Sequence, residues 1–502
     1  MKKPNIVYIL ADDLGYGDIS VNNPGSKINT SHIDTVAEAG IRFTEAHSSS
    51  AVCTPTRYSI LTGRYCWRTM LKQGVVGGYC PHLIDPERTT VASFLKAQGY
   101  DTACIGKWHL GMDWVKKGDE YWSVDFGQAI SNGPNSVGFD YYYGISASLD
   151  MPPYAYIEND RVTEIPDQLS KNDDSKEFWR EGMCAPGFSH IEVLPHITEK
   201  ACKFIQEHEN ADRPYFLYFP LPAPHGPILP LEQFVGKSNT NSYGDFVLQV
   251  DAVVGQIVQT LKDTNQFENT IVVFTSDNGC SPVADFEELK EAGHHPSYHF
   301  RGHKADIFEG GHHVPLVMSW PEGIKANSLS HEIVCLSDLL ATCAGILDVT
   351  LPDNAGEDSF DLSPIFRGES ENIRTRSSVI THSVNGSFAI QRGRWKLEMC
   401  PDSGGWSDPR PGCEESDTLP AIQLYDLEQD VGERNNIYTD HPDVVLSLRN
   451  ELTEIIRRGR STSGSKQAND GEVWWEQLNW IEADQSQMPK QGWGATVVKG
   501  CF

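Results

Sequence analysis

Apolar, β-rich runs alternate with helical patterns through the first three quarters of the chain. The runs expected as strands are residues 5–10, 102–106, 214–220, 270–276 and 314–320. Helical patterns lie between them, at 31–40, 87–98, 243–262 and 333–346. Strands that are apolar on both faces and alternate with helices indicate a sheet covered on both sides. We therefore expect an α/β fold with a large mixed, mostly parallel sheet sandwiched by helices.

The pattern changes after about residue 374. Short alternating strands are expected at 378–383, 387–391, 395–399 and 425–427, and one helix at 441–458. This predicts a small antiparallel sheet with a helix. The chain then divides into a large domain over 1–374 and a small C-terminal α+β subdomain over 375–502. The polar, then Trp-rich, tail from residue 461 is expected to pack back on the body.

The charge balance excludes two classes of partner. The 502 residues include 41 basic and 69 acidic side chains, a net charge of −28. A field this negative repels polyanions, so we expect no nucleic-acid and no membrane partner. The apolar run at 6–11 is shorter than the core of an export signal, of about 7–15 residues. We expect a cytoplasmic protein as written, or a periplasmic or secreted one if a signal peptide has been removed.

The sequence does not determine which cysteines form disulfides, and it does not determine the oligomeric state. Twelve cysteines are scattered without paired CxxC spacing, so a zinc ribbon is not expected. Some of them could pair in an exported protein, and the sequence does not say which.

Polar side chains follow two of the expected strands. Asp12 and Asp13 come after the first strand, and Asp277 and Asn278 directly follow the strand at 270–276. Ligands of open α/β sheets bind at the carboxyl ends of strands. Carboxylate and amide oxygens suit Ca²⁺, and less well Mg²⁺, and do not suit zinc. Alternatively, one pair caps a loop and the other forms a turn.

A cysteine stands at an expected helix start. Cys53 precedes Pro55, with Arg57 one turn into the helix. A helix N-terminus presents free N–H groups and positive potential, which favour an anion or an activated side chain. The pattern Cys-x-Pro-x-Arg is short, but here Leu61-Thr62-Gly63-Arg64 follows it, which makes it far more specific.

Six motifs together carry a resemblance. They are ADDLGYGD (11–18), CTPTRYSILTGR (53–64), GKWHLG (106–111), PAPHGP (222–227), TSDNG (275–279) and KADIFEGGHHVP (304–315). In this order they resemble the type I, formylglycine-dependent sulfatases of the alkaline-phosphatase superfamily, close to arylsulfatases and N-acetylgalactosamine sulfatases. The resemblance implies an alkaline-phosphatase-like fold and a sulfuric ester hydrolase.

The resemblance also implies a mechanism. Cys53 would be converted to formylglycine, whose hydrate offers two hydroxyls. One attacks sulfur and forms a covalent sulfate hemiester, and the second then expels sulfate. Pro55 and Arg57 match the motif read by the formylglycine-generating maturation enzyme, and Arg57 would also hold the diol.

Further site residues follow from the matching motifs. Asp12, Asp13, Asp277 and Asn278 match the metal ligands, with Cys53 completing the shell around Ca²⁺. Four more match the sulfate site: Lys107 and Lys304 would neutralise sulfate oxygens, His225 would protonate the leaving alkoxide, and His109 would deprotonate the second hydroxyl. Taken alone, each His or Lys could equally be a satisfied or solvated side chain.

The expected substrate is a sulfated carbohydrate, and a glycosaminoglycan such as chondroitin sulfate is the leading candidate. Trp114, Trp122 and Trp179 are candidates for a wall on which a sugar stacks. Two basic positions, Arg301 and His303, could meet further acidic groups on a polymer. The last two candidates, His312 and His313, stand where relatives often carry an arginine, and they either line the pocket or have structural roles.

Two other functions fit the same motifs. One is a phosphonate or phosphodiester hydrolase on the same scaffold. The other is a silent glycan-binding relative in which Cys53 stays unmodified.

Overall fold

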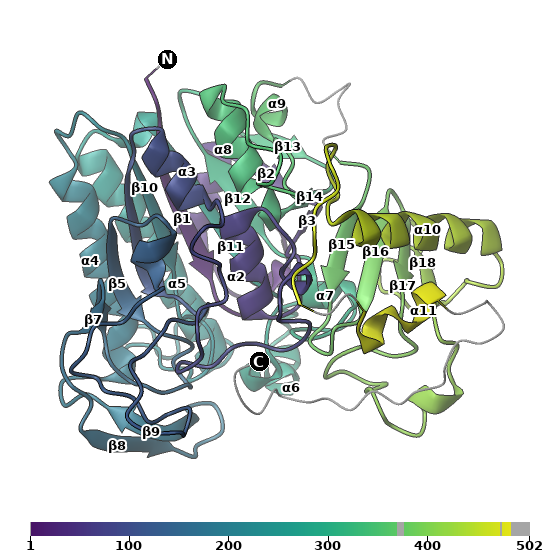
Figure 1. The fold of residues 1–502 in the computed structure, drawn as a ribbon, viewed down its shortest axis with the longest axis horizontal. Helices are drawn as coiled ribbons and strands as arrows, with labels where there is room; N and C mark the ends of the chain where they lie inside the picture. The colour runs from purple at the N-terminus through teal and green to yellow at the C-terminus, as the bar shows by residue number, and fades with distance from the viewer. Residues whose placement is uncertain (1, 369–375, 472–473, 483–502) are drawn as a thin grey trace.

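The computed structural model describes residues 2–368, 376–471 and 474–482. Ten strands form one large sheet (Figure 1). In spatial order they are β13 (Ser328–Ser330), β2 (Gly40–Phe43), β12 (Leu316–Ser319), β11 (Thr270–Ser276), β1 (Asn5–Ala11), β10 (Tyr215–Pro220), β4 (Asp101–Lys107), β5 (Tyr141–Ile145), β6 (Ile157–Glu158) and β7 (Arg161–Val162). The five from β11 to β5 are parallel, whereas the pairs β11–β12, β12–β2, β5–β6 and β6–β7 are antiparallel. The expected mixed, mostly parallel sheet is confirmed.

Helices cover both faces of the sheet, and the central strand β1 shows why. Ile6, Tyr8 and Leu10 join a core under α2 (Cys53–Thr62), α3 (Val91–Ala97) and α8 (Leu339–Leu347). The alternate residues Val7, Ile9 and Ala11 join a second core under α1 (Ser31–Glu38), α4 (Val193–Glu207) and α5 (Ser242–Asp263). Successive strand residues point to opposite faces, so β1 must be apolar throughout. Each buried aliphatic side chain contributes about 1.5–3 kcal/mol.

Two expected helices begin later than their patterns indicate. The pattern at 87–98 becomes a helix only at Val91, because the Thr90 side chain caps it by accepting from the Ser93 N–H. The pattern at 333–346 begins with the short strand β14 (Val334–Cys335), and α8 follows from Leu339. Here the Asp338 carboxylate accepts from the Cys335 N–H and stops the helix from extending backwards.

The C-terminal part is a four-stranded antiparallel sheet with one long helix, as expected. Its strands, in spatial order, are β15 (Val379–His382), β16 (Phe388–Arg392), β17 (Trp395–Glu398) and β18 (Gln423–Asp426). The helix α10 (Pro442–Arg458) buries Leu448, Leu452 and Ile456, which share one face. In the tail, Trp475 and Trp480 pack into the same core. The expected boundary at 374/375 and Trp493 lie outside the described residues.

Shorter elements complete the described chain. They are β3 (Ala46–His47), β8 (Gln168–Asn172), β9 (Trp179–Cys184), α6 (Phe286–Glu291), α7 (Glu309–His312), α9 (Ser363–Phe366) and α11 (Asn479–Glu482). The strands β8 and β9 form a separate hairpin at the lower left of Figure 1. Within the described ranges, no helix is both long and apolar enough to cross a bilayer.

Candidate active site

Two neighbouring parallel strands deliver four polar side chains to one point. Ala11, the last residue of β1, lies opposite Ser276, the last residue of β11. Asp12, Asp13, Asp277 and Asn278, which follow these residues, are at most 1% exposed. The Asn278 amide donates to Asp13 Oδ1 at 2.7 Å, and the Asp13 N–H donates to Asp277 Oδ1 at 3.3 Å. The structure therefore brings all four expected metal ligands together.

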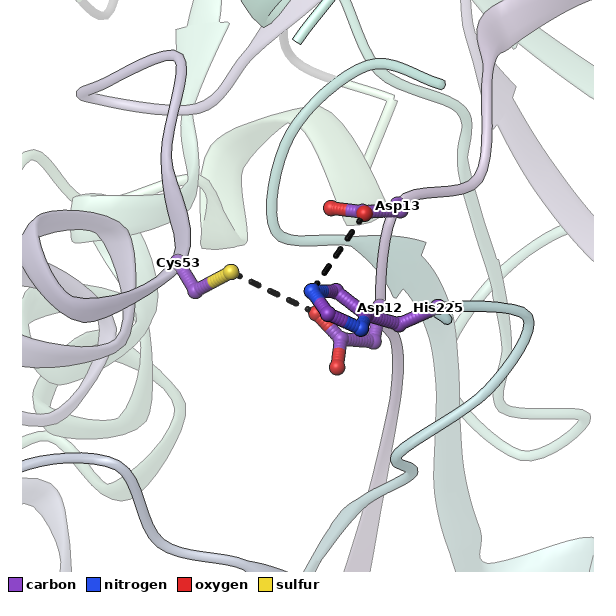
Figure 2. Close-up of side chains that lie close together, drawn as sticks. All are labelled: Asp12, Asp13, Cys53 and His225. Carbon is purple, nitrogen blue, oxygen red and sulfur yellow. Dashed lines mark hydrogen bonds and ion pairs between the residues drawn. The ribbon is translucent and has the colours of Figure 1, made fainter. Parts of the chain in front are cut away.

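Cys53 is the first residue of α2 and reaches the same point. Its thiol lies 3.5 Å from Asp12 Oδ1 (Figure 2). Ligand atoms of Asp12, Asp13, Cys53 and His225 all lie within 4.8 Å of one another. Burial raises the pKa of the Cys53 thiol well above its usual value. An unmodified Cys53 is therefore a protonated thiol, which is a weak nucleophile.

Three cations balance the three carboxylates. The Arg57 Nε–H donates to Asp277 Oδ2 at 2.9 Å, and Nη2 lies 2.7 Å from the same oxygen as an ion pair. The ammonium groups of Lys107 and Lys304 lie 2.6 and 2.7 Å from the carboxylates of Asp12 and Asp13 respectively. Burial alone would raise the pKa of Asp12, but Lys107 and the other cations outweigh it and hold this pKa well below the usual range. Asp12 is therefore ionised, whereas burial raises the pKa of Asp277 above its usual value despite the neighbouring Arg57.

The donor set fits a hard dication. Asn278 Oδ1 is buried and has no hydrogen-bond partner among the described residues. An orphaned amide oxygen next to three carboxylates is a ready ligand, since a buried polar atom without a partner is costly. Oxygen donors of this kind suit Ca²⁺ or Mg²⁺. Asp12, Asp13, Asp277 and Asn278 would hold such an ion, with residue 53 beside it.

Two histidines flank Cys53 with defined ring orientations. His109 Nε2–H donates to the Val76 carbonyl at 2.8 Å, which leaves Nδ1 as a buried lone pair without a partner in the described chain. Burial, reinforced by Lys107, keeps the pKa of His109 far below its usual value, so the ring is a neutral base. His225 Nδ1–H donates to the Gly226 carbonyl, and Nε2 lies 3.6 Å from Asp13 Oδ2.

A cavity of about 330 Å³, which we call the catalytic cavity, opens onto this group. The expected residues on its wall are Asp13, Cys53, His109, His225 and Lys304. Five other expected residues do not line it and lie behind these: Asp12, Arg57, Lys107, Asp277 and Asn278. Much of the remaining wall is not predicted from the sequence. It includes Asp150, Met151, Phe178, Arg180, Asn385 and Trp406.

None of the three candidate tryptophans lines the catalytic cavity. Trp114 is 6% exposed and donates to the Gly78 carbonyl within the core. Trp122 is exposed and packs on Tyr121. Trp179 stacks on His190 at 4.0 Å.

The residues on either side of Trp179 line the cavity instead. Arg180 points away from Trp179 because successive residues of β9 alternate between faces, and Phe178, the residue before β9, lines the same cavity. Arg180 forms an ion pair with Asp150 on the same wall.

The four expected basic residues lie in two different places. His312 and His313 are at most 2% exposed, and His313 Nδ1 lies 2.8 Å from the Glu309 carboxylate. The Arg301 guanidinium lies over the Phe308 ring and donates to the Glu433 carbonyl. These three side chains belong to the buried boundary with the C-terminal sheet and do not line the catalytic cavity. His303 lines a neighbouring hollow.

The fold and the site together define a class of enzyme, the hydrolases that cleave sulfate esters. The sulfatase family model matches residues 4–349. The chain belongs to the sulfatase family and is a sulfuric ester hydrolase.

Individual relatives cover almost the whole chain. An N-acetylgalactosamine-6-O-sulfatase of Bacteroides thetaiotaomicron is 34% identical over 500 residues, covering 91% of this chain and 93% of the relative. Human arylsulfatase A is 30% identical, with 94% and 91% covered. A solved structure from work on glycosaminoglycan metabolism by Bacteroides thetaiotaomicron superposes with a TM-score of 0.79 at 32% identity, covering 91% of this chain and 99% of that one. A phosphonate monoester hydrolase of Agrobacterium radiobacter shares the fold, with a TM-score of 0.60 at 18% identity.

Proposed function

We propose that this enzyme hydrolyses sulfate esters of a carbohydrate, a glycosaminoglycan such as chondroitin sulfate, with Cys53 matured to formylglycine. The observation that carries the proposal is the place of Cys53. It stands at the N-terminus of α2, 3.5 Å from Asp12, on the wall of the catalytic cavity. The N-acetylgalactosamine-6-O-sulfatase among the relatives supports an amino-sugar sulfate as substrate.

Maturation must precede burial of this segment. Every residue of α2, which includes Pro55 and Arg57, is buried in the folded chain. A maturation enzyme that reads Cys53, Pro55 and Arg57 therefore acts on the chain before it has folded here. The later role of Arg57 is to hold Asp277, as its two short contacts indicate.

The side chains divide the chemistry between them. A hydroxyl of the residue-53 diol attacks sulfur and gives its proton to the Asp277 carboxylate, while the S–O bond to the sugar breaks. His225, protonated on both ring nitrogens and held by its Nδ1–H at the Gly226 carbonyl, gives its Nε2 proton to the leaving oxygen. A sugar alkoxide needs this proton because it is a poor leaving group. Lys304, on the cavity wall, neutralises charge on the sulfate oxygens, and Lys107 adds to the positive potential from behind Asp12.

Release of sulfate needs a base, and His109 suits that role. Its Nδ1 lone pair has no partner in the described chain and its ring is neutral. It takes the proton of the second hydroxyl, the bond from carbon to sulfate oxygen breaks, and the aldehyde is restored. A bound Ca²⁺ would favour ionisation of the diol and polarise a sulfate oxygen.

The test is a panel of sulfated oligosaccharides together with an aryl sulfate and an aryl phosphate, assayed for released sulfate or phosphate. We expect sulfate release from 6-O-sulfated N-acetylgalactosamine units and from the aryl sulfate. A preference for the phosphate ester would overturn the proposal in favour of a phosphonate or phosphodiester hydrolase. Binding of the glycans without turnover would favour the silent relative.

A further inference from the structure

A second hollow adjoins the catalytic cavity, and Trp406 lines both. The second hollow has a volume of about 410 Å³ and is lined by Pro282, His303, Gly405, Trp406, Arg410 and Pro411. A volume of this size lies within the range of about 300–1,000 Å³ in which proteins bind small ligands. The two hollows therefore adjoin at the Trp406 indole, and Cys53 lines the first of them.

The wall formed by Trp406 comes from the C-terminal sheet. Trp406 lies in the long loop between β17 and β18, and a single buried carboxylate fixes it. Asp306 is fully buried, and its Oδ1 accepts from the backbone N–H of Trp406 at 2.7 Å and of Ser407 at 3.0 Å. Its Oδ2 accepts from the backbone N–H of His303 at 2.9 Å. One carboxylate thus holds both walls of the second hollow.

The approach of this loop requires a glycine. A Cβ on Gly405 would stand 2.5 Å from the Ala305 carbonyl and from Asp306 Oδ1. No other residue allows the loop to lie so close to the segment that carries Lys304. The loop is further held by the Ile307 N–H, which donates to the Ser403 carbonyl at 2.7 Å. The second hollow is therefore built into the fold two residues from the catalytic Lys304.

The lining has the chemistry of a sugar site with an acidic substituent. The partly exposed indole of Trp406 offers an apolar face, and the rings of Pro282 and Pro411 add apolar surface. The Arg410 side chain is 66% exposed. Its guanidinium lies 3.3 Å from the Asp408 carboxylate, and that side chain is itself 85% exposed. An exposed pair of this kind is weak, so the guanidinium is able to exchange its partner for a ligand carboxylate or sulfate.

We propose that the second hollow is a subsite for the sugar residue next to the sulfated one, and that Arg410 pairs with an anionic group on it. This rests on the proposed function and makes it more specific, because it implies that an acidic oligosaccharide is a better substrate than a sulfated monosaccharide. The sugar ring stacks on Trp406, whose other side bounds the catalytic cavity. In a molecule of net charge −28, a local cation is needed to hold a polyanion here.

The test compares kcat/KM for four substrates that carry the same 6-O-sulfated N-acetylgalactosamine. They are the monosaccharide, a tetrasaccharide with a neighbouring uronate, the same tetrasaccharide with the uronate reduced to the neutral sugar, and the reduced form carrying an additional sulfate. We expect Arg410→Gln to lower kcat/KM about tenfold for the acidic tetrasaccharides and to leave the monosaccharide unchanged. Comparing the uronate tetrasaccharide with the reduced tetrasaccharide that carries the additional sulfate shows which anion Arg410 binds.

Trp406→Ala should lower kcat/KM for all three tetrasaccharides, the neutral one included. The matched control is Arg434→Gln, which removes an exposed arginine from the segment after β18, where it lines neither hollow. Equal turnover of monosaccharide and tetrasaccharides by the unaltered enzyme would overturn the subsite. So would an Arg410→Gln effect of the same size on every substrate.

A binding arm separates the subsite from the proposed function. Desulfated uronate tetrasaccharide is titrated calorimetrically into Cys53→Ala and into Cys53→Ala combined with Arg410→Gln. Binding that weakens about tenfold with the second change supports the subsite even if no sulfated sugar is turned over. Absence of binding to either protein, or equal binding to both, contradicts it.

Discussion

The thiol of Cys53 lies 3.5 Å from Asp12 Oδ1, although 41 residues separate them along the chain. The two side chains meet because α2 begins where β1 ends. Both are buried, and the catalytic cavity reaches Cys53 but not Asp12. Residue 53 therefore stands between the carboxylates and the substrate, which is where a nucleophile is needed.

Removing the side chain at residue 53 should abolish turnover without unfolding the protein. Cys53→Ala is expected to lower kcat at least about 10³-fold, because a lost nucleophile is not replaced by its neighbours. Released sulfate measures the activity, and thermal unfolding should change little. The buried Cys104→Ala on β4, which does not line the catalytic cavity, is the matched control and should keep its activity. Comparable activity in Cys53→Ala would refute its role.

His225 should matter most when the leaving group is poor. His225→Ala is expected to lower kcat/KM for a sugar sulfate about 10²–10⁴-fold, the usual effect of a lost general acid. An aryl sulfate, whose leaving phenolate needs less help, should lose much less. The exposed His331→Ala serves as control. An equal loss on both substrates would assign His225 to binding and not to proton transfer.

A divalent ion should be required for activity and bound through Asn278. Chelation is expected to abolish sulfate release, and Ca²⁺ should restore it better than Mg²⁺. Asn278→Ala should weaken the affinity for the metal ion about 10–100-fold. Metal titration of the chelated protein measures this affinity. Asn269 also has an Oδ1 without a partner among the described residues, but it precedes β11 at the opposite end of that strand, so Asn269→Ala is the matched control. Full activity after exhaustive chelation would contradict the metal site.

Lys396 should be a stability residue. Its ammonium lies 3.0 Å from Glu309, 3.3 Å from Glu398 and 2.6 Å from Glu433, and all four side chains are at most 1% exposed. Burial raises the pKa of Glu433, whereas at Glu309 Lys396 outweighs burial and holds the pKa well below the usual range. Lys396→Met leaves buried charge uncompensated.

Urea denaturation measures the cost of this change. Lys396→Met should lower the free energy of unfolding by about 3–5 kcal/mol. The exposed Lys237→Met should change it by less than about 0.5 kcal/mol. Equal stabilities for the two variants would show that Lys396 does not hold the C-terminal sheet to the body.

Asp251 should make stability depend on pH. It lies on α5, and its Oδ1 accepts from the Ile33 N–H at 2.8 Å and the His32 N–H at 3.1 Å in the first turn of α1. Burial raises its pKa to about 6. The folded state therefore binds a proton between about pH 4 and 6 that the unfolded state has released, so stability falls as the pH rises through this window.

Asp251→Asn keeps an accepting oxygen and removes the titration. The variant should gain stability relative to the unaltered protein as the pH rises from 4 to 6.5, by up to about 3 kcal/mol for a shift of about two pKa units. Urea denaturation at the two pH values measures this. A difference that does not vary with pH would contradict the raised pKa.

The sequence predicted the residues at the strand ends better than those on the substrate side of the site. Asp12, Asp13, Asp277 and Asn278 could be placed together because two parallel strands end side by side. The substrate side was predicted poorly. Residue type favours Trp179, whereas strand alternation turns Arg180 towards the catalytic cavity, which Phe178, the residue before β9, also lines.

Trp406 could not have been found from its local sequence. It lies in the long irregular loop between β17 and β18, where no periodicity indicates a direction. Its position depends on the buried Asp306, 100 residues earlier in the chain. For His312 and His313 the sequence allows either a pocket or a structural role. Both are buried against Glu309 and Lys396, and only tertiary packing brings these charged groups to them.

The most direct test of the account is the mass of the tryptic peptide that covers residues 43–57, taken from active enzyme made in a host with the maturation enzyme. We predict the mass expected when the Cys53 thiol is replaced by an aldehyde, in a fraction of the protein that matches the active fraction. Fully active enzyme whose peptide carries only the unmodified thiol would contradict the account.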